Sequence, residues 1–451
     1  MKSLDKYKLS MFNIIKEDKN KNLLITNTLT NALIRIINNT NELIDFNLNN
    51  LLSLYNKHID LFIKTGILVP DNVNEQLLID EIYQKNVLKN ERLDIIILTT
   101  NRCNFSCAYC FQKRETYTLD SKQYDGILNF IETKIKENGY KNIKIRWFGG
   151  EPLLDKKGMI YFLNKMKSLS QTYKVSYGCG IISNGYLLDI NTFKILFKHK
   201  VINYQITVDG LPDINYRFLN NGKSTFNTIF NNLKRIRDEI KYSMFSITIR
   251  INFTRDLLNR VDEVIDLFFK EFGKDRRFGF SFIPVFDWSY KDSDFMKAKQ
   301  IQSQLITEEE IVEVMKKSVN KLDFKAWSNL KFANNECWAG TPHGYTIDAN
   351  GDILKCDFKL EGFDANVVGH IDLEGNVFLD NKKEKKWIFN TPLIECYSCG
   401  YFPLCLSTSC GAAKLDGIMK NKCNSFKHRV LDYLEIESYS LNNNFIEVKN
   451  E

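Results

Sequence analysis

Apolar residues form two alternating patterns along the middle of the chain. Six short, nearly continuous apolar runs predict buried strands: LDIIILTT (93–100), IKIRWFGG (143–150), YGCGIISN (177–184), NYQITVDG (203–210), FSITIRINF (245–253) and RFGFSFIPV (277–285). Between most of them, apolar residues recur at helical spacing, as in residues 225–240 and 257–272. Strands alternating with amphipathic helices favour a parallel sheet wrapped by helices. We therefore predict an α/β fold with a complete or partial (β/α)6 TIM-like barrel in residues 93–288.

The patterns on either side of this core differ from it. Residues 1–92 predict a small α+β unit and linker, with a hairpin in 21–37 and helical spacing in 46–70 that ends in a Gly and a short strand. Beyond the core, Thr307 and Glu310 form a capping-box pattern that predicts a bridging helix within 289–329. Residues 330–425 lack clear periodicity, and 426–451 are expected to form a C-terminal helix and tail.

Composition and charge exclude several classes of protein. A chain of 451 residues that is 44% hydrophobic can build two or three domains with proper cores. The net charge is +7, but Lys and Arg are scattered among Asp and Glu, so we expect no nucleic-acid partner. The first residues lack a secretory signal pattern, and no window of 18 apolar residues predicts a membrane span. We expect a cytoplasmic protein without a membrane partner.

The eleven cysteines point to metal binding, because disulfides are rare in a reducing compartment. Cys103, Cys107 and Cys110 follow the first core strand, on the rim where barrel enzymes carry their chemistry. Three thiolates are one short of a closed four-ligand shell, which leaves a position open. An iron–sulfur cluster and a zinc site with a remote fourth ligand both fit this spacing. Cys179 stands alone, and we interpret it as a small buried hydrophobe.

The stretch CNFSCAYC, with Tyr109 before the last Cys, resembles the signature of the radical S-adenosylmethionine (SAM) superfamily. The resemblance implies a [4Fe–4S] cluster whose open iron binds SAM, and reductive cleavage of SAM to a 5′-deoxyadenosyl radical. Further stretches resemble the family's SAM-binding motifs in the same order: GGEPLL (149–154), ISNG (182–185), ITVDG (206–210) followed by Arg217, and FIPVF (282–286). The SAM-binding residues implied are Tyr109, Gly149, Gly150, Glu151, Ser183, Asn184, Thr207, Asp209, Arg217 and Phe286.

The seven cysteines between 337 and 423 resemble the SPASM domain, an extension of radical SAM enzymes that modify peptides and proteins. The resemblance implies two auxiliary [4Fe–4S] clusters, and so three clusters in all. Cys337, Cys356 and Cys410 would hold the first, with His343 as a possible fourth ligand, and Cys396, Cys399, Cys405 and Cys423 the second. An open iron or a substrate thiolate is the alternative to His343. Asp357 resembles the catalytic base of anaerobic sulfatase-maturating enzymes, although a loop Asp that caps a turn fits equally.

Three functions remain open from the sequence. The first is a peptide maturase that forms a thioether or carbon–carbon crosslink in a ribosomally made precursor. It is the preferred interpretation because residues 1–92 resemble a winged-helix-like leader-recognition element that adds a leader peptide as a strand. The second is an anaerobic sulfatase maturase that makes formylglycine, and the third is a metal-organised scaffold or redox sensor. Either enzyme would need a cellular reductant such as flavodoxin or ferredoxin.

Overall fold

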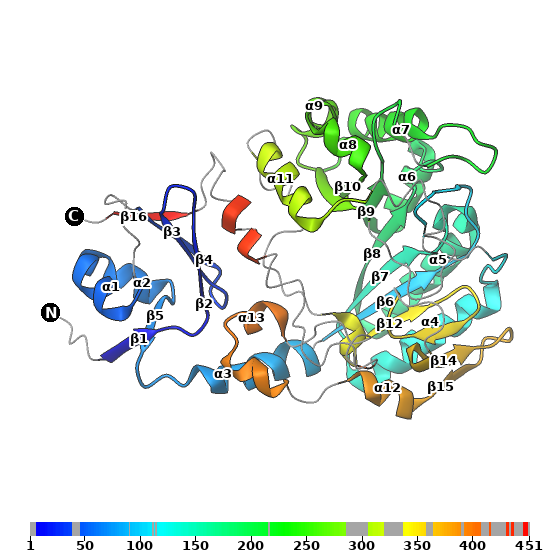
Figure 1. Cartoon of the computed structure of the whole chain (residues 1–451). Coiled ribbons are helices and arrows are strands. Elements are labelled where there is room, and N and C mark those ends of the chain that lie inside the picture. The colour runs from blue at the N-terminus through cyan, green and yellow to red at the C-terminus, as the bar shows by residue number, and fades with distance from the viewer. Residues whose placement is uncertain are drawn as a thin grey trace. The chain divides into compact units, whose positions relative to one another are not determined.

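The structure is a computed structural model in which two compact units are described separately. The core unit comprises residues 91–329 and 343–386, and the terminal unit comprises 1–90, 330–342 and 387–451 (Figure 1). The described residues are 6–37, 46–89, 91–110, 112, 115–214, 217–285, 305–319, 337–357, 364–388, 392–406, 415, 430–432, 434–436 and 445–449. No described helix has the length and apolar character needed to cross a membrane.

The core unit is built on parallel strands that follow one another in chain order across the sheet. They are β6 (Arg92–Leu98), β7 (Asn142–Phe148), β8 (Ser176–Ser183), β9 (Val201–Thr207), β10 (Ser246–Phe253) and β11 (Phe278–Pro284). All six strands predicted from the apolar runs are confirmed. Parallel pairing needs a crossover between neighbours, and the helical stretches between the strands supply it.

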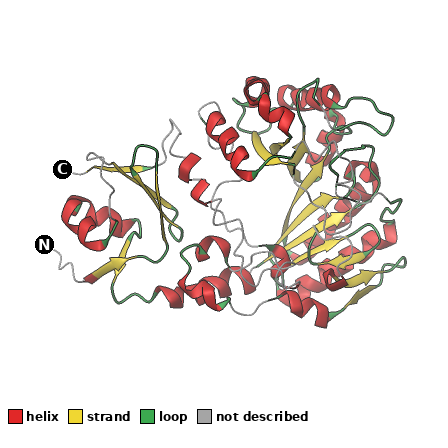
Figure 2. Cartoon of the chain, viewed as in Figure 1, coloured by secondary structure: helices red, strands yellow, loops and turns green. Residues whose placement is uncertain are grey.

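Helices cover the outer face of this sheet, as Figures 1 and 2 show. They are α4 (Ser121–Asn138), α5 (Lys156–Tyr173), α6 (Ile190–Lys198), α7 (Phe226–Glu239), α8 (Arg255–Asn259) and α9 (Val261–Phe272). Their apolar stripes bury aromatic side chains such as Phe162 and Phe193 against the strands. The other face of the sheet is the concave face, and it carries the half-buried polar residues of the strands. The predicted α/β barrel-like fold is confirmed.

The sheet continues past β6 into the Cys-rich region. β12 (Gly344–Ile347) pairs in parallel with β6, and β13 (Asp352–Leu354), β14 (Val367–Ile371) and β15 (Val377–Leu379) follow in antiparallel order. The helix α12 (Asn381–Trp387) comes after them. Tyr345 of β12 packs edge-on against Phe130 of α4 and donates a hydrogen bond to Glu384. The strands are so short that the sequence pattern did not reveal them.

The predicted bridging helix is present as α11 (Glu308–Ser318). Its capping box is formed as expected, with Thr307 and Glu310 exchanging hydrogen bonds at the first turn. Arg255 at the start of α8 is paired with Glu310 and also donates to the Leu305 carbonyl. These contacts hold α11 beside the last strands of the core unit.

The terminal unit contains a four-stranded sheet in the order β16, β4, β3, β2. The strands are β2 (Asn13–Glu17), β3 (Leu23–Asn27), β4 (Ala32–Ile37) and β16 (Ile446–Lys449). Helices α1 (Leu48–Leu54) and α2 (Ile59–Lys64) pack against one face, and β1 (Tyr7–Leu9) pairs with β5 (Leu68–Pro70). The predicted hairpin, helices and short strand are confirmed. The sequence did not predict that residues 446–449 join this sheet.

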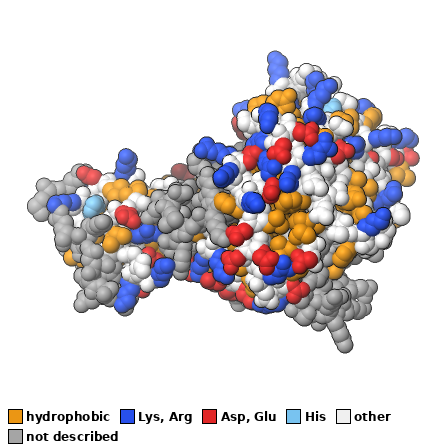
Figure 3. Space-filling view, turned by 90° about the horizontal axis from the view of Figure 1, so that it is seen from above, with side chains coloured by type: hydrophobic (Ala, Val, Ile, Leu, Met, Phe, Trp, Pro, Cys, Tyr) orange, Lys and Arg blue, Asp and Glu red, His pale blue; other side chains and the backbone are white. Residues whose placement is uncertain are grey.

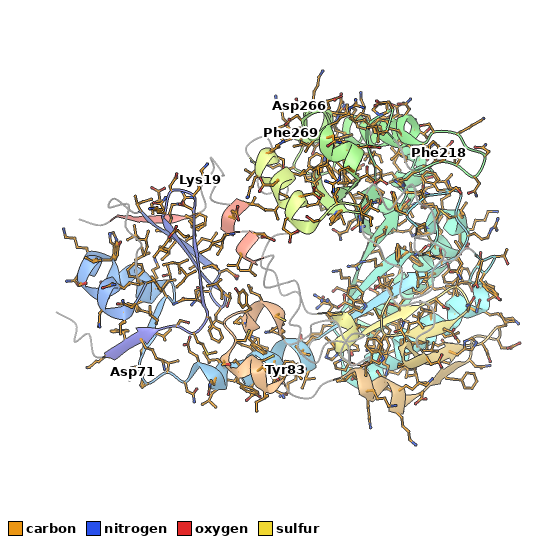
Figure 4. All side chains as sticks on the ribbon, in the orientation of Figure 1. Lys19, Asp71, Tyr83, Phe218, Asp266 and Phe269 are labelled. Carbon is orange, nitrogen blue, oxygen red and sulfur yellow. The ribbon has the colours of Figure 1, made fainter. Side chains whose placement is uncertain are left out.

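Part of the Cys-rich region also packs within the terminal unit. The turn Ile394–Ser398 and the helix α13 (Phe402–Cys405) contact α3 (Glu75–Tyr83), and Tyr83 lies where they meet (Figure 4). Phe12, Tyr83 and Phe402 are fully buried in this cluster. The apolar contacts fix the loop of Cys396, Cys399 and Cys405 on the N-terminal part of the chain.

Candidate active site

The carboxyl ends of β6 and β7 are joined by direct backbone contacts. The loop after β6 carries Cys103, Cys107 and Cys110, and the Gly149–Gly150–Glu151 turn follows β7. Gly150 N donates to Thr100 O (2.8 Å), and Glu151 N donates to Arg102 O (2.9 Å). The cysteine loop is therefore held at its start by the neighbouring turn.

Both glycines of this turn are required by the close approach of the two backbones. Gly149 has φ +117°, and a Cβ there would lie 2.5 Å from Thr100 O. A Cβ on Gly150 would lie 2.2 Å from Arg102 O. Only glycine lets the turn after β7 touch the cysteine loop without displacing it.

Gly150→Ala is therefore expected to push the cysteine loop away from β7. Overpacking of this kind costs about 1–3 kcal/mol, and we expect a clear drop in iron content after anaerobic reconstitution. Gly178→Ala is the matched control, because a Cβ on Gly178 of β8 meets no atom within 4 Å. Equal iron content in the two variants, measured by a colorimetric assay, would show that the close approach is dispensable.

Glu151 links the ends of β7 and β8 from a fully buried position. Its carboxylate accepts hydrogen bonds from Ser183 Oγ (2.9 Å), Asn184 N (2.8 Å) and Leu153 N (3.0 Å). Burial raises the pKa of Glu151, and these donors oppose the rise. Through these hydrogen bonds, the Glu151 side chain fixes the GGEP and ISNG stretches relative to each other.

Three further hydrogen bonds fix the cysteine loop, from the end of β8 and from the loop after β9. Asn184 Nδ2 donates to Asn104 Oδ1 (2.8 Å), so the end of β8 meets the residue after Cys103. Asn220 Nδ2 donates to Cys103 O (3.0 Å), and Ser106 N donates to Phe218 O (2.7 Å). Phe218, labelled in Figure 4, belongs to the loop between β9 and α7. The cysteine loop is thus anchored by three neighbouring segments.

Arg217 brings a buried positive charge to the same place. Its guanidinium donates to Thr207 O, lies 3.8 Å from Asp209 Oδ2, and stacks over the Phe105 ring at 5.1 Å. Its charge lowers the pKa of Cys107, against the larger effect of burial, which raises it. A cation at this position favours the thiolate form that binds metal.

Asp209 and Tyr109 are both tied to β10 through Asn252. Asn252 N donates to Asp209 Oδ1 (3.0 Å), and Asn252 Nδ2 donates to the Tyr109 hydroxyl (3.2 Å). Arg250, two residues earlier on the concave face, donates from Nε to Asn252 Oδ1 (2.9 Å). The motif residues from four separate stretches of sequence therefore form one connected network.

The donor set of the cysteine loop fits an iron–sulfur cluster, because soft thiolates are the ligands that such clusters take. Burial raises the pKa of Cys103 to about 11, and the nearby thiols of Cys107 and Cys110 add to the rise. Within the described ranges, no three His, Cys, Asp or Glu side chains are grouped tightly enough to surround one metal ion. A cubane does not need such grouping, because each cysteine binds a different iron.

The structure describes some of the residues assigned to the first auxiliary cluster. His343 is buried, and its Nδ1 lies 2.6 Å from the Tyr140 hydroxyl, edge-on to that ring. Cys356 is held through its backbone, which exchanges hydrogen bonds with the Asn366 side chain. Burial raises the pKa of the adjacent Asp357, and the positive charge of Arg146 opposes the rise. The ligand roles of His343 and Cys356, and the role of Asp357 as a base, stay predictions.

Other predicted residues are placed as follows. Cys337 is half-buried in the terminal unit, as are Cys396, Cys399 and Cys405, where Cys399 N donates to Cys396 O (3.1 Å). Phe286, Cys410 and Cys423 lie outside the described residues. Cys179 is fully buried in β8, where burial raises its pKa to about 12, as expected of a core residue.

Sequence reasoning missed Asn104, Asn252 and Arg250. A signal was available for the last two, because SITIRINF alternates apolar and polar residues. In a barrel strand the polar positions of such a pattern face the interior. Asn104 lies inside the cysteine motif and had no pattern of its own.

Charged side chains are dispersed on the face of the molecule shown in Figure 3, where Lys and Arg mix with Asp and Glu.

Comparison with known proteins gives matches to part of the chain. A family model described as Radical SAM superfamily matches residues 97–266. The radical SAM cyclopropyl synthase TigE of Paramaledivibacter caminithermalis is 24% identical over 209 residues, 42% of this chain and 43% of that protein. A GTP 3′,8-cyclase of Helicobacter pylori (strain HPAG1) is 27% identical over 232 residues, 50% of this chain and 64% of the relative. Each match spans less than two thirds of the relative.

Among solved structures, native anSMEcpe with bound AdoMet and Cp18Cys peptide is similar with a TM-score of 0.53. The identity is 17%, and the similarity covers 77% of this chain and 97% of that one. At this identity the comparison shows a shared fold. The matched residues 97–266 include the cysteine loop and the network around Glu151 and Arg217.

Proposed function

Because the chain contains a radical SAM domain, we propose that it is a radical SAM enzyme that modifies a ribosomally made precursor peptide. The observation that carries the proposal is the anchoring of the three-cysteine loop among the GGEP, ISNG and VDG segments. The loop offers three cysteine ligands to a cluster. One iron of that cluster would keep an open coordination position, and SAM would bind there. A cluster bound there, with SAM, would supply a 5′-deoxyadenosyl radical.

The protein's own residues would prepare this chemistry. Cys103, Cys107 and Cys110 would hold the cluster, and the Gly149–Gly150 turn would let the backbone approach the SAM amino group. Arg217, Thr207 and the ISNG segment would bind the carboxylate and ribose. Arg217 is already held by Thr207 O and Asp209, so its charge is positioned before SAM arrives. The hydrogen bond between Asn252 of β10 and Tyr109 of the cysteine loop belongs to the same network.

A peptide is the substrate class best supported. The terminal unit has the predicted hairpin and helices of a small peptide-recognition element, and anSMEcpe, which shares the fold, is described with a bound Cys peptide. TigE, a relative over part of the chain, is described as a cyclopropyl synthase, so carbon–carbon bond formation belongs to the proposal beside a thioether. The cysteines between 337 and 423 would form a SPASM-type domain with two auxiliary clusters.

The proposed reaction balances as a two-electron oxidation. Joining a thiol sulfur to a carbon removes one hydrogen from each. The hydrogen on carbon would leave as an atom to the 5′-deoxyadenosyl radical, and the thiol hydrogen would leave as a proton, for which Asp357 is the proposed acceptor. The remaining electron would pass to the auxiliary-cluster site. The electron that cleaves SAM comes from flavodoxin or ferredoxin, in a cytoplasmic setting that keeps the thiols reduced.

The experiment is co-expression with a short Cys-bearing precursor encoded beside the gene. We expect the purified precursor to lose the mass of two hydrogens for each link. A precursor with its Cys replaced by Ala separates the products, because a thioether requires the sulfur and a carbon–carbon link does not. Exchange of sulfur for oxygen together with the loss of two hydrogens would indicate formylglycine instead. An unchanged precursor together with conversion of GTP would contradict the peptide proposal.

A further inference from the structure

The edge of β4 in the terminal unit is occupied by the chain's own C-terminal segment. β16 pairs with β4 in parallel, with Ile446 opposite Ile34, Glu447 opposite Arg35, and Val448 opposite Ile36. About 400 residues of sequence separate the two strands. Among the described strands of this sheet, β2 and β16 pair on one side only. Without β16, β4 would present an open row of backbone donors and acceptors.

The side chains of this segment dock on both faces of the sheet. Val448 is 0% exposed and joins the cluster of Ile34 and Ile36 beneath α1 and α2. Phe445 is 6% exposed and packs on the opposite face, with Ile14 and Leu24. The segment therefore joins two apolar clusters, one on each side of the sheet.

Arg35 contacts both an aromatic and an acidic side chain of this segment, which adds specificity to the docking. The Arg35 guanidinium lies 4.9 Å from the centre of the Phe445 ring and 3.5 Å from Glu447 Oε1. Ile446, by contrast, is 43% exposed and contributes little apolar contact. The edge thus selects an extended segment with a large apolar residue, an acidic residue two positions later and a branched aliphatic residue next to it.

We propose that the β4 edge is a docking site for a peptide strand and that residues 445–449 occupy it in cis. A precursor peptide would reach this edge only by displacing them. The proposal rests on the proposed function, since it assigns the site at which the precursor is captured and the device that restrains capture. Strand addition at a sheet edge supplies affinity through the backbone and specificity through the alternate side chains.

Self-occupancy raises the apparent Kd of a competing peptide by the reciprocal of the open fraction. If the edge is open in about one molecule in ten, opening it permanently tightens peptide binding about tenfold. Deletion of residues 445–451 is the simplest way to open it. The probe is a fluorescein-labelled synthetic peptide with the sequence NFIEVKNE, residues 444–451 of this chain. The measurement is fluorescence anisotropy with the reconstituted protein.

We expect the probe to bind the truncated protein at least about tenfold more tightly than the full chain. The same peptide carrying Val448→Asp should bind neither. Equal binding of the probe to both proteins, or binding to neither, would overturn the proposal. If the truncated protein does not fold by circular dichroism, full-length Glu447→Lys replaces it. This substitution places a positive charge opposite Arg35 at an exposed position. It should loosen β16 without removing an apolar contact.

A matched pair of full-length variants tests the role in precursor capture. Val448→Asp puts a charge into the buried apolar cluster, whereas Ile446→Asp puts the same charge two residues away on the same face of the strand, where the side chain is 43% exposed. We expect Val448→Asp alone to tighten binding of the precursor. If the two variants bind the precursor alike while the wild type still modifies it, this proposal fails and the proposed function stands. If none of the three proteins modifies the precursor, the proposed function fails.

Discussion

Replacing Cys107 by alanine is expected to abolish the formation of 5′-deoxyadenosine from SAM. Cys107 lies in the centre of the cysteine loop, where the charge of Arg217 favours its thiolate form. With two thiolates left, the loop cannot hold a cluster that has one open iron. Because the cofactor carries the chemistry, the rate should fall at least about 10³-fold. The measurement is liquid chromatography of the products after anaerobic reduction with dithionite.

Cys179→Ala is the matched control for this loss. Cys179 is fully buried in β8 and belongs to the core. Its replacement should lower the free energy of unfolding by about 1 kcal/mol and leave deoxyadenosine formation unchanged. A Cys107→Ala protein that retained wild-type deoxyadenosine formation would contradict the assignment of the loop.

The second large effect is expected for Glu151→Ala. The change would leave three buried or partly buried donors, from Ser183, Asn184 and Leu153, without their acceptor. Each lost hydrogen bond to a charged group costs about 1.5–3 kcal/mol, and part of the loss is recovered by relaxation. We expect the free energy of unfolding to fall by about 3 kcal/mol or more, and deoxyadenosine formation to fall about 10²-fold because the ISNG segment moves.

Ser183→Ala provides the comparison for Glu151→Ala. It removes one donor and leaves Glu151 with its two backbone donors, so the cost should be about 1.5 kcal/mol, the low end for one hydrogen bond to a charged group. Urea unfolding followed by circular dichroism gives both values. Equal stability of the Glu151→Ala and Ser183→Ala proteins would show that Glu151 does not hold the ends of β7 and β8 together.

The core of this molecule was predictable because its strands carry their signal locally. Nearly continuous apolar runs marked all six parallel strands, and the capping box marked α11. The motif residues at the strand ends followed from the fold, since parallel strands bring their carboxyl ends to one rim. Residue order and spacing were enough to place Cys103, Gly150, Ser183 and Asp209 on that rim.

The remainder depends on contacts that no local pattern encodes. β12 is only the four residues Gly344–Ile347, and its pairing with β6 joins segments about 250 residues apart. β16 is equally short, and its place beside β4 is decided by where Phe445 and Val448 find apolar neighbours. The Asn104–Asn184 and Asn252–Tyr109 hydrogen bonds likewise arise only once the strands are side by side.

The account is tested most directly by one measurement on the wild-type protein. After anaerobic reconstitution with iron and sulfide, the chain is incubated with SAM and dithionite, and 5′-deoxyadenosine is quantified together with bound metal. The account predicts deoxyadenosine and about twelve iron atoms per chain, from three clusters of four. Bound zinc with no deoxyadenosine would contradict it and would favour a metal-organised scaffold.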